Sequence, residues 1–202
     1  MVLDIEHEDR YLVHRSLEGD TEAFGRLVDR YQGAVYATAY YYAGRHGAAE
    51  DIAQDAMLEA FRSLRSLNDP GRFGPWLKEV TSRTAANWVR RNGNRLRHET
   101  PLPHRRVQSI EDVRIGPEEA MKREERYERI RAALDTLPEQ YRLPLIMRYL
   151  QEASYAEIAH FTGQTHGEIR GLLQRGSGLL RDVILSQEKR GGGELPWHRA
   201  HE

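Results

Sequence analysis

Two helix-capping sequences that follow each other closely near the C-terminal end constrain the fold most strongly. Ser154 precedes Glu157 by three residues, and Thr165 precedes Glu168 by three residues. In such a capping box the hydroxyl and the carboxylate satisfy backbone N–H groups of the first turn, so each pair predicts the start of a helix. Gly163, between them, favours a tight turn. Two short capped helices joined by a glycine turn are typical of a helix-turn-helix.

The rest of the 202-residue chain has helical periodicity, with no long alternating pattern of the strand type. Asp20 is an N-cap, Gly19 ends the helix before it, and Gly44 and Gly47 end the helix after it. The expected helices begin at about residues 9, 20, 48, 75, 117, 138, 154 and 165. The expected core includes Phe24, Leu27, Val28, Tyr31, Val35, Ala39, Ala53, Met57, Ala60, Phe61, Leu64, Trp76, Leu143, Ile146, Met147, Leu150, Ile169, Leu173 and Leu180.

We therefore predict an all-α protein with two small helical domains, over residues 9–96 and 118–186. Residues 97–117, with three prolines, many charges and isolated apolar residues, are expected to form a flexible linker. Residues 187–202 are expected to be a mobile tail.

Composition excludes several classes of protein. There is no cysteine, which excludes disulfides, thiol catalysis and cysteine-ligated metal. The N-terminus lacks the pattern of a signal peptide, and no run is long and apolar enough for a membrane helix, so we expect a cytoplasmic protein. Net charge is −1, but seven Arg and one acidic residue lie between residues 83 and 106. Arginine suits phosphate and base edges, so this segment favours nucleic acid as a partner.

The order of these segments resembles the extracytoplasmic-function (ECF) group of bacterial sigma factors, over about residues 10–96 and 118–186. Four segments carry the resemblance: Gly19–Phe24 continuing to Leu27 and Tyr31, Ala49–Asp55, Phe73 with Trp76 and Leu77, and Leu137–Gln140 before the capped helix pair. The resemblance implies a sigma factor that binds core RNA polymerase and directs promoter-specific initiation, without catalysis or cofactor of its own. It also implies an anti-sigma factor as a partner.

Two other classes of function stay open. A stand-alone helix-turn-helix regulator would bind duplex DNA without polymerase. An enzyme would need a buried cluster of titratable groups, which the sequence pattern does not suggest.

The third expected helix has an acidic face. Residues three and four apart share a helix surface, which here carries Glu50, Asp51, Gln54, Asp55 and Glu59. By resemblance, Asp51, Gln54 and Asp55 dock a coiled coil of the largest subunit of core RNA polymerase. The alternative is an ordinary solvated face.

The fourth expected helix combines cations with aromatic residues, as single-stranded DNA requires. The resemblance assigns it and the preceding loop, residues 67–73, to recognition and melting of the minus-ten element. The candidate DNA contacts are Arg83, Asn87, Trp88, Arg90, Arg91 and Arg95. Arg83 replaces an Asn common in the family and has only donors, so it differs in what it can read. The alternative places the tryptophans in the core and uses the arginines for solubility.

The last helix is the expected recognition helix for the minus-thirty-five element, with its N-terminal residues in a major groove. By resemblance, the candidate contacts are Thr165, His166, Glu168, Arg170 and Arg175. Gly171, Gly176 and Gly178 each cost about 1 kcal/mol of helix propensity and predict a soft helix. The alternative is a domain that mainly binds protein.

The nine histidines form no recognised metal motif. We expect no metal site.

Overall fold

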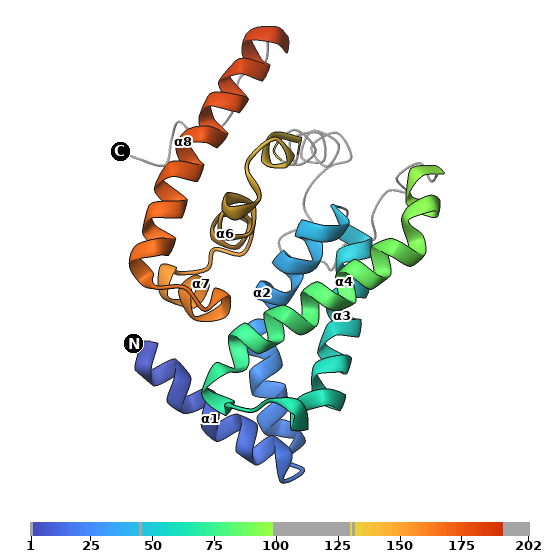
Figure 1. The fold of residues 1–202 in the computed structure, drawn as a ribbon, viewed down its shortest axis with the longest axis vertical. Helices are drawn as coiled ribbons and strands as arrows, with labels where there is room; N and C mark the ends of the chain where they lie inside the picture. Colours follow the sequence, from blue (N-terminus) through green and yellow to red (C-terminus); the bar gives the residue numbers. More distant parts are fainter. Residues whose placement is uncertain (1, 45, 99–129, 131, 192–202) are drawn as a thin grey trace, which may run out of the picture.

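The computed structural model describes residues 2–44, 46–98, 130 and 132–191, which form helices joined by short turns, with no strand among them. The helices are arranged as in Figure 1. Their bounds are α1 Val2–Leu17, α2 Thr21–Ala43, α3 His46–Ser63, the 3₁₀ turns η1 Leu64–Ser66 and η2 Pro70–Arg72, α4 Phe73–His98, α6 Glu139–Leu150, α7 Tyr155–Thr162 and α8 His166–Gly191. The predicted all-α class is confirmed. None of the described helices is long and apolar enough to cross a bilayer.

Helices α1 to α4, here called the N-terminal unit, pack around one another. Asp20 caps α2 as predicted, accepting hydrogen bonds from the N–H groups of Glu22 and Ala23 at 3.1 Å. Gly44 ends α2 in the left-handed conformation, whereas Gly47 lies inside α3. The first helix begins at Val2 rather than near Asp9, and ion pairs of Glu8 and Asp9 hold this part of α1 against α2.

The core face of α3 differs from the prediction. Ala60 and Leu64 are buried as expected, but Phe61 is 47% exposed, and Ile52 and Ala56 fill the core instead. Ala53 and Met57 lie at the edge of this face. Phe61 stays at the rim, where its ring meets Phe24 edge-on at 4.9 Å between centroids. Small residues on the inner face bring α3 close to α2, which apolar periodicity alone did not indicate.

Helices α6 to α8, here called the C-terminal unit, contain the predicted helix-turn-helix. Both capping boxes are formed. The Glu157 N–H donates to Ser154 Oγ at 3.2 Å, and the Ser154 N–H donates to a Glu157 carboxylate oxygen at 2.7 Å. The same reciprocal pair joins Thr165 and Glu168, at 3.2 and 2.7 Å. Gly163 between them adopts the left-handed conformation with φ of 73°.

The core of the C-terminal unit follows the prediction in part. Ile146, Met147, Ile169 and Leu173 are buried, while Leu143, Leu150 and Leu180 are only half-buried. Tyr141, Leu145 and Leu172 are also buried and were not expected there.

Helix α8 continues through its glycines to Gly191, so residues 187–191, expected in the tail, are helical. A Cβ at Gly176 would lie 3.1 Å from the Leu145 side chain and 3.2 Å from that of Tyr141. This glycine therefore lets α8 pack closely on α6 rather than softening the helix.

The two units pack directly against each other, with α7 on α1 and α4, and α6 on α2. Their buried residues form one continuous apolar cluster. Tyr41 of α2 also donates a hydrogen bond of 2.9 Å to Glu139 at the start of α6. The predicted linker lies outside the described residues, except that residues 97 and 98 continue α4. Residues 192–202 of the predicted tail lie outside them as well.

Candidate protein and nucleic-acid interfaces

The predicted acidic face lies on the exposed side of α3. Asp51, Gln54 and Asp55 are all exposed, and they alternate along the helix with the buried Ile52 and Ala56. Among the described residues, neither Asp51 nor Asp55 has a hydrogen-bond or ion-pair partner beyond its own helix backbone. Their charges are thus available to a basic partner.

An apolar extension of this face escaped the sequence analysis. Leu58 is 52% exposed one turn beyond Gln54 and Asp55, and it is followed by the partly exposed Phe61. Apolar residues beside carboxylates let a surface both attract a cationic helix and exclude water from it. The spacing 51, 54, 55, 58 indicates that Leu58 shares this face, whereas the apolar periodicity predicts a core position for Phe61.

The basic segment of α4 projects from the bundle. Arg83, Arg90 and Arg91 are exposed, while Trp88 is half-buried and packs against the core. Arg90 donates to Asn87 Oδ1 at 3.1 Å, which places these two side chains together. The Arg95 side chain lies outside the described residues. Trp76 is half-buried, with its ring 5.7 Å from that of Phe73, so it is less enclosed than predicted.

The loop before α4 is tied to the first helix. Asp69 accepts a hydrogen bond of 3.0 Å from the Gly71 N–H and forms an ion pair of 3.2 Å with Arg10 of α1. Arg72 is exposed beside them, whereas Phe73 is buried. The loop is therefore ordered by α1 in a way that the sequence did not indicate.

The residues of the expected recognition helix have two roles. His166, Arg170 and Arg175 are exposed at the start of α8. Thr165 and Glu168 are also exposed, but their side chains form the capping box, and hydrogen bonds from the Thr165 N–H and hydroxyl hold the pKa of Glu168 below its ordinary value. Glu168 thus fixes the start of the helix.

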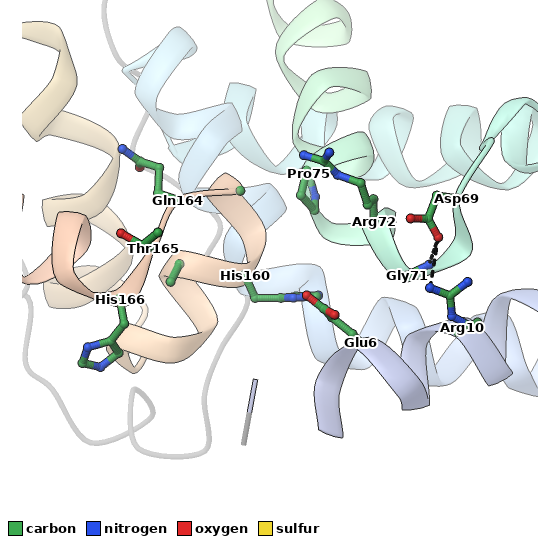
Figure 2. Close-up of a pocket in the computed structure, with 12 residues that line it drawn as sticks. Glu6, Arg10, Asp69, Gly71, Arg72, Pro75, His160, Gln164, Thr165 and His166 are labelled. Carbon is green, nitrogen blue, oxygen red and sulfur yellow. Dashed lines mark hydrogen bonds and ion pairs between the residues drawn. The ribbon is translucent and has the colours of Figure 1, made fainter. Parts of the chain in front are cut away.

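A cavity of about 390 Å³ lies between the two units. Figure 2 shows the residues that line it. Arg72 and Pro75 come from the loop and the start of α4, while Thr165 and His166 come from the helix-turn-helix. Glu6 and Arg10 of α1 close a third side. Two segments predicted to contact different promoter elements therefore meet at one cavity.

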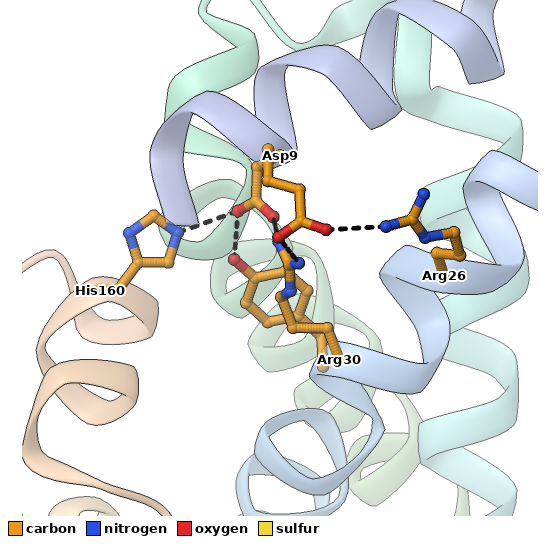
Figure 3. A network of polar contacts seen from close by, with 6 residues as sticks. Asp9, Arg26, Arg30 and His160 are labelled. Carbon is orange, nitrogen blue, oxygen red and sulfur yellow. Dashed lines mark hydrogen bonds and ion pairs between the residues drawn. The ribbon is translucent and has the colours of Figure 1, made fainter. Parts of the chain in front are cut away.

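A buried polar network joins the units beside this cavity, as Figure 3 shows. Asp9 of α1 is 0% exposed, and its carboxylate accepts hydrogen bonds from Tyr31 and Arg30 of α2. His160 of α7 lies against the same carboxylate, with Nε2 2.9 Å from Oδ2. Burial, reinforced by the Asp9 charge, raises the pKa of Tyr31, so the phenol stays a donor. Glu8 pairs with Arg30 at the rim.

Sequence reasoning missed this network because its members are far apart in the chain. The only local signal is that Asp9 lies three and four residues before the buried Leu12 and Val13, and so on the inner face of α1. His160 is likewise set among the buried Ile158, Ala159 and Phe161. Among the described residues no group of three or more His, Cys, Asp or Glu side chains is placed to hold a metal ion.

Two family models match the chain. The model described as Sigma-70 region 2 matches residues 27–95, and the model described as Sigma-70, region 4 matches residues 127–179. The first covers α3 and the basic part of α4, and the second covers the helix-turn-helix.

Curated relatives of the chain are sigma factors as well. The ECF RNA polymerase sigma-E factor of Escherichia coli K12 is 30% identical over 177 residues, which are 83% of this chain and 89% of that protein. The ECF RNA polymerase sigma factor SigE of Mycolicibacterium smegmatis is 31% identical over 170 residues. The alignment covers 80% of this chain but 62% of SigE, so the chain spans less than two thirds of that relative.

A solved structure has the same fold. CnrH, in complex with the cytosolic domain of CnrY, aligns with a TM-score of 0.58 at 19% identity, covering 89% of this chain and 98% of that one. With both family models and a relative matched along most of its length, the resemblance noted in the sequence is confirmed: the chain belongs to the extracytoplasmic-function sigma factors of the sigma-70 family.

Proposed function

We propose that this chain binds core RNA polymerase and directs it to specific promoters. The observation that carries the proposal is the exposed face of α3, on which Asp51, Gln54 and Asp55 have no partner among the described residues. In a sigma factor this is the surface for the polymerase. Its charge steers a basic partner and sets the register, while Leu58 adds apolar contact.

The promoter contacts divide between two helices. The basic end of α4, with the loop 67–73, contacts the minus-ten element through Arg83, Asn87, Trp88, Arg90, Arg91 and Arg95. The start of α8 enters the major groove at the minus-thirty-five element, where His166, Arg170 and Arg175 contact DNA and Thr165 and Glu168 fix the helix start. These roles assign residues 9–96 and 118–186 to two domains with separate DNA elements.

The chain acts by binding, without chemistry of its own, and works in the cytoplasm, where polymerase and chromosome are found. Family membership adds an anti-sigma factor as a regulatory partner. Which promoters the chain selects depends on the bases that α4 and α8 contact.

The test is a titration of the purified chain against bacterial core RNA polymerase. Asp51→Arg combined with Asp55→Arg is expected to weaken binding at least a hundredfold. The matched control is Asp29→Arg with Asp182→Arg, which changes the net charge equally at exposed residues outside α3. Circular dichroism would establish that all variants are folded.

Failure of the wild-type chain to bind core enzyme from a close relative would overturn the proposal. Binding of duplex DNA without core enzyme would then favour a stand-alone regulator. An equal loss in the control variant would show that net charge, rather than the α3 face, controls binding.

A further inference from the structure

We propose that the cavity beside the buried polar network binds a free amino acid, or another small zwitterionic metabolite of similar size. Its volume of about 390 Å³ is that of a small-molecule site. The anionic group of the ligand lies at Arg72 and the start of α8, and the cationic group lies at Glu6 and His160. The proposal goes beyond promoter recognition and does not depend on it, because it concerns the chain without polymerase or DNA.

One side of the cavity offers positive charge. The exposed Arg72 guanidinium has no hydrogen-bond or ion-pair partner among the described residues. A Cβ at Gly163 would lie 3.9 Å from Arg72 Nη2, so this cation lies beside the turn that leads into α8. Thr165 and His166, at the start of α8, line the same cavity. The first N–H groups of a helix favour negative charge, so a carboxylate fits this side.

A buried imidazole points to a second group of the ligand. His160 lines the cavity, and its side chain is only 4% exposed. Its Nε2 lies 2.9 Å from Asp9, which is paired with Arg30. A carboxylate only accepts hydrogen bonds, so Nε2 carries the proton, and Nδ1 of the neutral ring is an acceptor.

This Nδ1 atom has no partner among the described residues, and Figure 3 shows it without a contact. A buried polar atom without a hydrogen bond costs free energy, and such atoms are rare in folded proteins. A ligand that brings an N–H donor into the cavity would satisfy the His160 ring.

Glu6 of α1 adds a negative charge to the lining of the cavity (Figure 2). Arg10, one turn further along α1, forms its ion pair with Asp69 at 3.2 Å, and Glu6 has no partner among the described residues. An ammonium group, with three N–H donors, matches the two unpaired acceptors, the Glu6 carboxylate and His160 Nδ1. The unpaired groups of the cavity therefore call for both an anion and a cation.

The remaining lining narrows the class of ligand. Pro75 and Ala159 are the only apolar residues among those that line the cavity, apart from glycines, and no phenyl or indole ring is present. Sites for nucleobases or acyl chains need more apolar or ring surface. The lining contains two arginines and two carboxylates, so a zwitterion leaves the site neutral. Gln164 supplies a further amide, which favours an amino acid with a polar side chain.

Calorimetric titration of the purified full chain with each proteinogenic amino acid, at concentrations up to millimolar, tests the site. We expect at least one with a polar side chain to bind. At about a hundred times its Kd it should raise the melting temperature by about 5 °C or more. The N-acetyl derivative of that amino acid lacks the ammonium group, and the carboxamide derivative lacks the carboxylate. Each should bind about tenfold more weakly or worse.

Two variants place the ligand in this cavity. Glu6→Gln and Arg72→Gln keep the shape of the lining and remove one charge each, so each should weaken binding about tenfold. The matched controls are Glu79→Gln and Arg65→Gln, at exposed residues that do not line the cavity, and they should bind as the wild type does. Circular dichroism would establish that all four variants are folded.

Three results would overturn the proposal. They are the binding of no amino acid, equal binding of the N-acetyl or carboxamide derivative, and wild-type affinity in folded Glu6→Gln and Arg72→Gln. Binding to core RNA polymerase is measured separately, so failure of the ligand site leaves the proposed function standing. Failure to bind polymerase, in turn, does not affect the calorimetric result.

Discussion

Asp9 of α1 and the aspartates of α3 have the same carboxylate in opposite environments. Asp9 is fully buried and has three partners from two other helices. Asp51 and Asp55 are exposed and have none among the described residues. A buried carboxylate contributes to stability because removing it strands its donors, whereas an exposed one contributes mainly to recognition. The difference shows that position, rather than residue type, separates a structural carboxylate from carboxylates that are available to a partner here.

The largest expected effect is on stability. Asp9→Ala leaves the buried Tyr31 hydroxyl without its acceptor and the half-buried Arg30 guanidinium with Glu8 alone, so we expect a loss of about 3–5 kcal/mol in the free energy of unfolding. Urea denaturation followed by circular dichroism measures it. Asp55→Ala is the comparison and should change the value by less than about 0.5 kcal/mol. Similar losses in the two variants would remove the distinction between the carboxylates.

The next effect concerns binding. Asp51→Asn keeps the size of the side chain and removes one charge from the face of α3, so we expect about tenfold weaker binding to core enzyme at low salt. The difference from wild type should shrink as ionic strength rises, because salt screens exposed charges. Titrations at two salt concentrations would measure this. A deficit that does not change with salt would argue against an electrostatic role.

A smaller loss is expected at the helix that carries His160. Ser154→Ala removes the hydroxyl that accepts the Glu157 N–H, which should cost about 1 kcal/mol of unfolding free energy. Ser66→Ala, at an exposed serine in η1, is the matched control and should have no measurable effect. The urea midpoints of the two variants, compared with that of the wild type, measure these changes in stability. If both are unchanged, the capping box does not stabilise α7.

The smallest effect on stability is expected at an exposed carboxylate that caps a helix. Asp20 is such a group, exposed like Asp51 but hydrogen-bonded like Asp9. Hydrogen bonds from the Ala23 N–H and Arg15 hold the pKa of Asp20 below its ordinary value of 3.8. Its charged form is thus favoured in the folded state, so its contribution is present above that ordinary value and disappears as the pH falls through the lowered pKa. Asp20→Asn should flatten the decline in urea midpoint between about pH 6 and about pH 3. Asp29→Asn, without a cap, should retain the wild-type decline; equal slopes in all three proteins would contradict the assignment.

Local features could be predicted from the sequence, whereas contacts between distant segments could not. Asp20, Ser154 and Thr165 cap helices through neighbours two or three residues away, so their spacing was sufficient. Phe61 was assigned to the core because it is apolar and in register, but the helix crossing leaves it at the rim. The hydrogen bond between Asp9 and His160 spans 151 residues, and the sequence around either residue does not indicate the other as its partner.

The candidate interfaces show the same limit. The exposure of the acidic face of α3 was predictable from its periodicity. Its apolar extension was not predicted, because Leu58 drew no prediction and Phe61 was expected in the core. The roles of the individual DNA contacts remain predictions from the family. The joining of Arg72 and His166 at one cavity depends on how the two units pack, which no periodicity encodes.

Gly176 is the point at which α8 approaches α6 most tightly among the glycines of α8. A side chain there would meet Tyr141 and Leu145, so this contact fixes the distance between the two helices. The first residue of the helix, His166, lies ten residues away, or about 15 Å along the axis at about 1.5 Å per residue. A side chain at position 176 that pushed α8 away from α6 would rotate the N-terminal end of α8 while leaving every residue there unchanged. The direction of the N-terminal end of α8, which we propose to enter the major groove, therefore depends on a glycine outside the proposed DNA contacts.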